Sequence, residues 1–417
     1  MFITPTRSAP SASTSRSAAT VLAGVLLLAG LAGCAPASGD TDTPSNSGSG
    51  TAAVACPDEP SAAGTTPALV LLVGVHANAP AADVPAMLAC DIRDTLRAGS
   101  PVAVVGLDGD PAVEDTIRFD STAQNDAARS DDLTAAEKQV LSTVRGARAS
   151  SDGSDLVAGM NVAADVAASL GSLDALIVVI DSGLPDRGAL NMTTPGMLAA
   201  RPAEVAGFLA DQHALRKLDG MRVDLVGIGY TSSPQEPLTP SMTDNLTAIL
   251  RTSLDKAGAT VRVRPAPRTG NAPDTTFTTT PAPLPSTPTF TPASTTVYDD
   301  TTALGFLPDT TTLRDPPAAS QAVASLAAWL TADPQRRATI TGTCASDGTP
   351  AGRARLSRAR ADAIKALLTD LGVDPAQIAT SGAGYIADPP DRRPDGTFDP
   401  AKAAKNRSVR ITTTETP

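Results

Sequence analysis

The chain has 417 residues, a formal net charge of −11, 18% charged residues and 3% aromatic residues. An acidic chain with so few aromatic side chains lacks the basic, base-stacking surface of nucleic-acid-binding proteins, so we expect no nucleic-acid partner. Its two histidines, His76 and His213, are too few for a histidine-rich zinc centre or a histidine proton shuttle. The length supports two or three domains.

Residues 1–33 have the layout of an export signal. Basic residues without any acid precede an apolar run at 21–31 that is too short to span a membrane comfortably. The run ends in the letters LAGC at 31–34, which resemble the lipobox of bacterial lipoproteins. The resemblance implies cleavage before Cys34, a diacylglyceryl group on its thiol and a further acyl chain such as palmitate on the new amine, which anchors the protein to a membrane without a spanning helix. The alternative is an ordinary secretory signal followed by an incidental cysteine.

Export also changes how the cysteines are interpreted, because disulfides persist outside the cytoplasm. Cys56 and Cys90 flank the first predicted strand, so a bridge between them is one prediction. The alternative leaves both as thiols. In the first case Cys344 is the unpaired cysteine.

Composition divides the rest of the chain into four stretches. Residues 34–66 are rich in Ser, Gly, Thr and Pro, which predicts a disordered tether, and residues 265–296 form a Pro/Thr-rich linker with extended geometry. Two globular domains are expected, at 67–264 and 297–417.

The first domain alternates apolar runs with helical patterns. We expect strands at 68–75, 102–107, 175–180, 222–229 and 260–264, and helices near 82–97, 155–169, 202–218 and 241–257. Continuous Val/Ile/Leu runs between helices are typical of a parallel sheet buried on both faces. The prediction is therefore a doubly wound, Rossmann-like α/β domain.

Two segments at the edges of these elements resemble landmarks of von Willebrand factor type A (vWA) domains. They are DGSDL at 152–156, which opens a helix, and VVIDSG at 178–183, which closes a strand. In that family a Thr/Ser and an Asp, here Ser154 and Asp181, help to hold Mg²⁺.

The third landmark of that family, an Asp-x-Ser-x-Ser loop after the first strand, is missing. The loop here carries His76 and Asn78 instead, so too few oxygen ligands remain for a metal site. We expect no metal and no cofactor, with Ser154 as a helix N-cap, Asp181 as a turn residue, and a degenerate pocket at His76, Asn78 and Asp181.

The C-terminal stretch predicts a βαβαβ order of the α+β class. We expect strands at 303–307, 338–343, 382–385 and 408–412, and helices at 318–331 and 352–371.

Four motifs in this stretch carry a second resemblance. They are ITGT at 340–343, LSRARA at 356–361, GAG at 382–384 and NRSVR at 406–410. In order and spacing they resemble the landmarks of the OmpA-like peptidoglycan-binding domain. The resemblance implies non-covalent binding of the cell-wall stem peptide, with Arg360 clamping a carboxylate of diaminopimelate through its planar fork. Thr343, Ser357, Asn406 and Arg407 are expected as secondary contacts, with capping roles as the alternative.

The chain departs from this family at one position that matters. The family has a carboxylate that pairs with the ammonium of diaminopimelate, and Ala345 stands there instead, after Cys344 in place of Thr. Asp347, two residues on, is the candidate replacement. The alternatives are a different stem peptide, weak binding, or a turn to protein contacts.

Neither a nucleophile elbow, nor a P-loop, nor a HExxH motif is present, so we expect no enzyme. The favoured hypothesis is a lipid-anchored envelope protein, in the cell wall or periplasm, that binds peptidoglycan while its α/β domain binds a protein partner. A second hypothesis is an adhesion or assembly lipoprotein whose vWA-like domain binds a protein, with or without a metal, and whose OmpA-like domain has lost wall binding. A third is an exported enzyme with an unrecognised site on the α/β domain.

Overall fold

The structure of the chain is a computed structural model that describes residues 66–415. The predicted signal peptide at 1–33, Cys34, Cys56 and all but the last residue of the tether lie outside the described residues. Between residues 66 and 415, no helix combines the length and apolar character that crossing a membrane requires.

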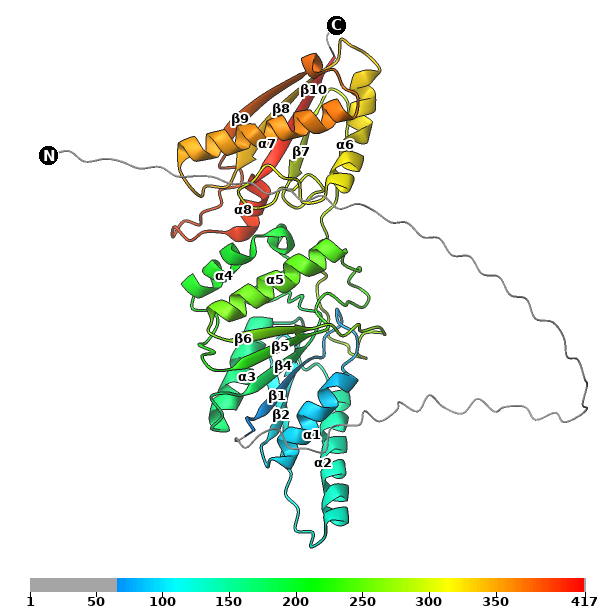
Figure 1. Ribbon diagram of the computed structural model, residues 1–417, viewed down its shortest axis with the longest axis vertical. Coiled ribbons are helices and arrows are strands. Elements are labelled where there is room, and N and C mark those ends of the chain that lie inside the picture. The colour runs from blue at the N-terminus through cyan, green and yellow to red at the C-terminus, as the bar shows by residue number, and fades with distance from the viewer. Residues whose placement is uncertain (1–65, 416–417) are drawn as a thin grey trace, which may run out of the picture. The chain divides into compact units, whose positions relative to one another are not determined.

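The first sheet is open and has the strand order β3-β2-β1-β4-β5-β6 (Figure 1). Neighbouring strands are parallel, except that β3 runs antiparallel to β2. The chain adds strands outward from β1 on one side and from β4 on the other, so the order reverses between β1 and β4. The strands are β1 (Leu69–Gly74), β2 (Val102–Leu107), β3 (Ala112–Ile117), β4 (Leu176–Ile180), β5 (Arg222–Val226) and β6 (Thr260–Arg264).

Helices cover both faces of this sheet. Alternate residues of β1 point to opposite faces: Leu69 and Leu71 pack with α1 and α2, whereas Val70 and Leu72 pack in the core formed with α3, α4 and α5. All of β1 is therefore buried, as its continuous apolar run predicts. The helices are α1 (Ala89–Arg97), α2 (Asp126–Gly146), α3 (Leu156–Ser169), α4 (Pro202–Asp211) and α5 (Pro240–Lys256), with short 3-10 turns at Ala86–Leu88 and Met197–Ala199.

Two elements of this domain are not predicted by the sequence pattern. Strand β3 reads AVEDTI, and every residue before Ile117 is at least partly exposed. Helix α2 buries only Leu133, Val140 and Val144 along its length. Both elements are largely polar, so hydrophobic periodicity gives little signal for either of them.

The second sheet has the strand order β7-β10-β8-β9. Strands β8 and β9 are parallel, and β10 is antiparallel to both β7 and β8. Helices α6 and α7 pack on this sheet through a core that includes Tyr298, Ile340 and Ile411. The elements are β7 (Thr295–Asp299), α6 (Pro316–Thr331), β8 (Arg337–Cys344), α7 (Pro350–Asp370), a 3-10 turn at Pro375–Gln377, β9 (Ile378–Tyr385), α8 (Pro400–Asn406) and β10 (Ser408–Thr414).

The strand predicted at 303–307 is wrong. The first strand of this sheet is β7, where the β-branched and aromatic letters TTVYD pair with β10. Residues 303–307 place Leu304 and Phe306 in the core, and Phe306 forms only an isolated bridge with Leu313. Their apolar letters therefore report burial rather than strand pairing.

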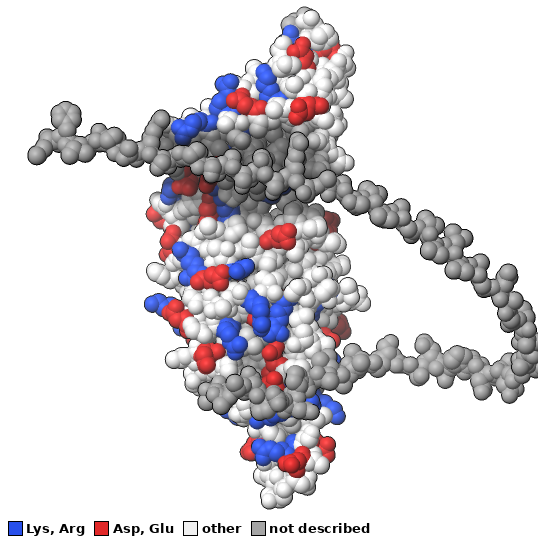
Figure 2. Space-filling model, viewed as in Figure 1, with Lys and Arg blue, Asp and Glu red and all other residues white. Residues whose placement is uncertain are grey.

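Residues 265–294, most of the predicted linker, contain neither helix nor strand. Three of these residues, Ala266, Thr279 and Ala282, are nevertheless buried, and both alanines belong to the cores of the α/β domain. On the face that Figure 2 shows, basic and acidic residues are interspersed among many uncharged ones, with no broad field of one sign.

Candidate functional site

A pocket of about 290 Å³ lies between α7 and the loop that follows β8, and Arg201 of the first domain also lines it. Thr349 caps α7 by accepting a hydrogen bond from the Gly352 N–H (3.1 Å), which sets where the helix begins. Arg353 and Arg360, two helical turns apart, therefore lie on one face of α7 and both line the pocket.

Arg360 is 2% exposed and is only partly paired. Its Nε donates to the carbonyl of Thr310 (3.0 Å), and its guanidinium lies over the ring of Phe306 at 4.9 Å. Its Nη2 has no hydrogen-bond partner among the described residues. Burial lowers the pKa of Arg360 and nearby Asp300 opposes this, but an arginine stays charged in proteins. A buried guanidinium with a free edge is suited to bind a carboxylate.

The loop after β8 places Asp347 in the wall of the same pocket. Arg353 holds this loop through its Nη1, which donates to the carbonyls of Ser346 (2.8 Å) and Gly348 (2.6 Å). Asp347 is exposed, and its Oδ1 accepts from the Gly348 N–H (2.9 Å). Ala345 lines the pocket too and is 4% exposed, with no polar side-chain atom to offer. Asp347 therefore lines the same pocket as Arg360, and its role as the replacement carboxylate stays a prediction.

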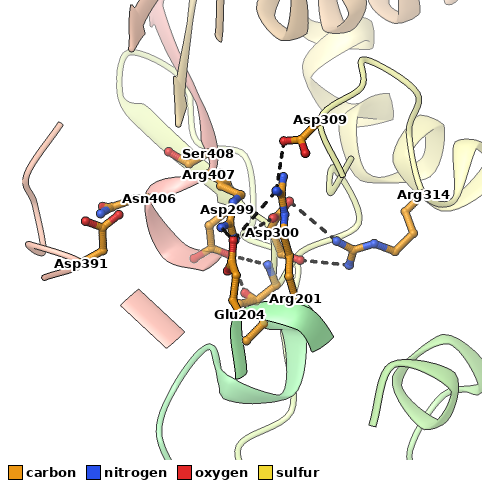
Figure 3. Close-up of polar contacts among 12 residues, drawn as sticks. Arg201, Glu204, Asp299, Asp300, Asp309, Arg314, Asp391, Asn406, Arg407 and Ser408 are labelled. Atoms are coloured by element: carbon orange, nitrogen blue, oxygen red, sulfur yellow. Dashed lines mark hydrogen bonds and ion pairs between the residues drawn. The ribbon is translucent and has the colours of Figure 1, made fainter. Parts of the chain in front are cut away.

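Arg407, the arginine of the NRSVR motif, is buried in a network of charges (Figure 3). It donates through Nη2 to Glu204 of α4, and its Nη1 lies 3.9 Å from Asp300 Oδ2. Burial raises the pKa of Asp300, and Arg407 leads the surrounding arginines that oppose this. The charge of Arg407 is therefore paired with carboxylates inside the protein, although Arg407 also lines the pocket.

The same network brings in residues that sequence reasoning missed. Arg201, at the start of α4, lines the pocket and donates to Asp309 (3.1 Å; Figure 3). Arg314 lies 3.7 Å from Asp300. No motif marks these residues. The sequence does not show that Asp300 lies beside several arginines, because their proximity depends on the pairing of β7 with β10.

The other predicted contacts are buried in structural roles. Ser357 is fully buried and accepts from the Gly384 N–H (3.0 Å), which ties α7 to the GAG motif. Asn406 donates to the carbonyl of Pro389 (2.9 Å), and its Oδ1 has no partner among the described residues. The hydroxyl of Thr343 bonds to Asn406 and Ser408. For these residues a direct ligand contact stays a prediction.

The C-terminal domain matches a known protein family. Residues 305–403 match the sequence profile of the OmpA family. The C-terminal domain is OmpA-like. The matched range includes Arg360 and Asp347 but stops short of Asn406 and Arg407.

Solved structures to which the chain is similar include the peptidoglycan-associated lipoprotein from Burkholderia pseudomallei, at 24% identity over 29% of this chain and 90% of that chain, with a TM-score of 0.23. Another is the periplasmic domain of Helicobacter pylori MotB, at 16% identity over 30% of this chain and 76% of that chain, with a TM-score of 0.24. A third is an outer membrane protein from Borrelia burgdorferi B31, at 23% identity over 28% and 86%, with a TM-score of 0.21. No curated protein sequence matches this chain.

Outside the OmpA-like domain, the carboxyl ends of β1 and β4 bring together part of the predicted degenerate pocket. His76 Nε2 lies 2.8 Å from Asp181 Oδ1, and both side chains are buried. Asp181 Oδ2 accepts from the Gly183 N–H (2.7 Å), as expected of a turn residue. A Cβ at Gly74 would lie 2.2 Å from Asp181 Oδ1, so the close approach of β1 requires glycine there.

The predicted N-cap at Ser154 is wrong, because Asp155 caps α3 by accepting from the Ala158 N–H (3.0 Å). Ser154 is fully buried, and its Oγ has no partner among the described residues. Within residues 66–415, no three of the His, Cys, Asp and Glu side chains gather where they could hold a metal ion.

The cysteines within the described residues differ in state. Cys90 is disulfide-bonded, and its predicted partner Cys56 lies outside the described residues. Cys344 is free and buried beside the pocket, with its Sγ 3.6 Å from the carbonyl of Arg353.

Proposed function

We propose that this protein belongs to the cell envelope and binds peptidoglycan non-covalently through its OmpA-like domain. The observation that carries the proposal is the buried guanidinium of Arg360, whose Nη2 has no partner among the described residues, in the wall of a pocket that Asp347 also lines. A diaminopimelate-type stem residue presents a carboxylate beside an ammonium. Arg360 would bind the carboxylate, and Asp347 would pair with the ammonium.

The N-terminal sequence supports a membrane anchor for this binding. The lipobox-like LAGC implies that the mature chain begins at Cys34 and carries acyl chains, on the extracytoplasmic face of a membrane. The protein would then connect that membrane to the wall, while its α/β domain binds a protein partner. We assign it no catalytic role and no cofactor. Incorporation of radiolabelled palmitate, lost in Cys34→Ala, tests the anchor.

The test of wall binding is co-sedimentation of the mature chain with insoluble peptidoglycan. Arg360→Ala should lose retention, whereas Arg355→Ala, an exposed arginine on the same helix, is the matched control and should keep it. Arg360→Lys keeps the charge but not the fork, so it should bind weakly. A free stem tripeptide containing diaminopimelate should compete. Retention that survives Arg360→Ala would contradict the proposed site.

Ala345 favours one alternative function. If the wild-type chain is not retained at all, the missing carboxylate marks a domain that has lost wall binding, and the protein is instead an envelope adhesion or assembly lipoprotein. Parallel loss of retention in Arg360→Ala and Asp347→Ala would support the wall-binding proposal and place the ammonium partner at Asp347.

A further inference from the structure

The segment 278–282, within the predicted linker, lies against the α/β domain at the carboxyl ends of its strands. Asn78, which follows β1, and Asp186, which follows β4, both bond to Thr280. The order of the sheet reverses between these two strands. In open α/β sheets this reversal point is where ligands bind.

Three alternate residues of the segment have both main-chain groups bonded to the domain. Such bonding holds an extended peptide by its backbone, independently of its side chains. At Thr278, the N–H donates to Asp152 Oδ1 (2.7 Å) and the carbonyl accepts from the Gly153 N–H (2.8 Å). At Thr280, the N–H donates to Asp186 Oδ2 (2.6 Å) and the carbonyl accepts from Asn78 Nδ2 (3.1 Å). At Ala282, the N–H donates to Gln235 Oε1 (2.7 Å) and the carbonyl accepts from Gln235 Nε2 (3.3 Å).

Two side chains of the segment are buried against the domain, and the hydroxyl of Thr278 also donates to Asp152 Oδ1 (3.1 Å). Thr279 is 6% exposed and accepts from the Ala77 N–H (3.3 Å), and Ala282 is 4% exposed. Thr278, Thr280 and Pro281 are exposed. The domain therefore buries small side chains at two positions, three residues apart, and leaves the two side chains between them exposed.

The domain carries more polar groups here than the segment uses. Asn78 is fully buried, and its Oδ1 has no hydrogen-bond partner among the described residues, although its Nδ2 bonds to Thr280. The hydroxyl of Ser154, next to Gly153 that donates to the Thr278 carbonyl, is also fully buried and without a described partner. Buried polar groups are normally paired, so unpaired ones beside a bound segment indicate a site built for a ligand with further polar atoms.

We propose that this edge of the α/β domain is a binding groove for an extended peptide, which the chain's own segment 278–282 occupies. A protein partner that presents an extended segment with small side chains three positions apart displaces it. The inference rests on the proposed partner-binding role of the α/β domain and names the chemistry of that partner.

The test uses the mature chain and a fluorescein-labelled peptide of residues 274–286, DTTFTTTPAPLPS. Ala282→Arg in the chain puts a long cation into a buried position and ejects the chain's own segment, whereas Pro283→Arg adds the same charge at the next, exposed position and is the matched control. Fluorescence polarisation should show saturable binding to the Ala282→Arg chain and at least tenfold weaker binding to the wild-type and Pro283→Arg chains. Adding Gln235→Leu to the Ala282→Arg chain should weaken binding at least tenfold, because both main-chain bonds at position 282 are lost.

A second measurement leaves the segment unchanged, in case Ala282→Arg does not fold. Protease sites inserted after Asp274 and after Ser286, both exposed, turn the segment into a bound peptide once they are cut. Exchange with excess labelled peptide within hours supports the groove. Failure to exchange would show that the segment is a permanent part of the fold and would overturn the proposal. Peptide binding that Gln235→Leu leaves unchanged would overturn it as well. Wall retention is a separate readout, so the failure of either proposal is recognised independently of the other.

Discussion

Thr343 and Ser408 join the end of β8 to the start of β10 through a buried hydroxyl. Thr343 Oγ1 accepts from the Ser408 N–H (3.1 Å) and lies 2.7 Å from Ser408 Oγ, and it donates to the carbonyl of Asn406 (2.6 Å). The hydroxyl that the motif marks as a wall contact is thus occupied inside the protein. It holds the NRSVR segment next to the pocket.

Thr343→Val should therefore reduce stability rather than wall binding. Valine keeps the shape but leaves the buried Ser408 N–H without its acceptor, which costs about 1–3 kcal/mol. The single tryptophan, Trp329, lies in α6, so its fluorescence during urea unfolding reports on the OmpA-like domain. Thr343→Ser retains the hydroxyl and is the control. Lost retention with unchanged stability would show that Thr343 contacts the wall directly.

Ala345→Asp should strengthen wall binding. The substitution restores a carboxylate to the pocket wall beside Arg360 and Arg407. One hydrogen bond between charged groups contributes about 1.5–3 kcal/mol, so affinity for a soluble stem peptide should rise roughly ten- to a hundredfold by titration calorimetry. Ala345→Asn, which lacks the charge, should give little gain. No gain in Ala345→Asp, combined with loss in Asp347→Ala, would mean that Asp347 already binds the ammonium.

The Cys344 thiol should be inert in the folded protein. Burial raises its pKa, against the opposing charge of Arg360, so little reactive thiolate forms near neutral pH. Alkylation by iodoacetamide at pH 8, followed by mass spectrometry, should be roughly a hundredfold slower in the native chain than in urea. Cys344→Ser is the blank. Equal rates would mean that the pocket wall opens freely.

Sequence patterns predicted the parts of this fold that are apolar and continuous. The bounds of β2, a fully buried apolar run, agree with the predicted range. Those of β6 agree as well, although this strand alternates Val with Thr and Arg and none of its residues is buried. The polar α2 and β3 gave no such signal. Arg360 was singled out because four motifs occur in order; the structure buries it in the lining of a pocket that Asp347 also lines, and its contact with a stem peptide stays a prediction.

Contacts between residues far apart in the chain were not predictable. Glu204 meets Arg407 across a separation of 203 residues, and Asn78 meets Thr280 across 202. Composition predicts that the Pro/Thr-rich linker is extended, but it does not predict that its backbone bonds to Asp186 and Gln235. Such pairs depend on how the sheet orders its strands.

Asp181 should make the α/β domain sensitive to acid. Burial alone would raise its pKa, but His76, the Gly183 N–H and Arg268 together hold that pKa below its usual value. The folded state therefore binds fewer protons than the unfolded state, in which the pKa is about 3.9. The stabilisation is complete above that value and is lost as the pH falls through the folded pKa.

Asp181→Asn should reduce the free energy of unfolding by about 3 kcal/mol at pH 7. Its deficit relative to wild type should shrink towards pH 3, measured by urea unfolding with far-UV circular dichroism, while the exposed Asp347→Asn shows no comparable change. A deficit that stays constant from pH 7 to pH 3 would show that Asp181 stabilises the fold through its shape and not through its charge.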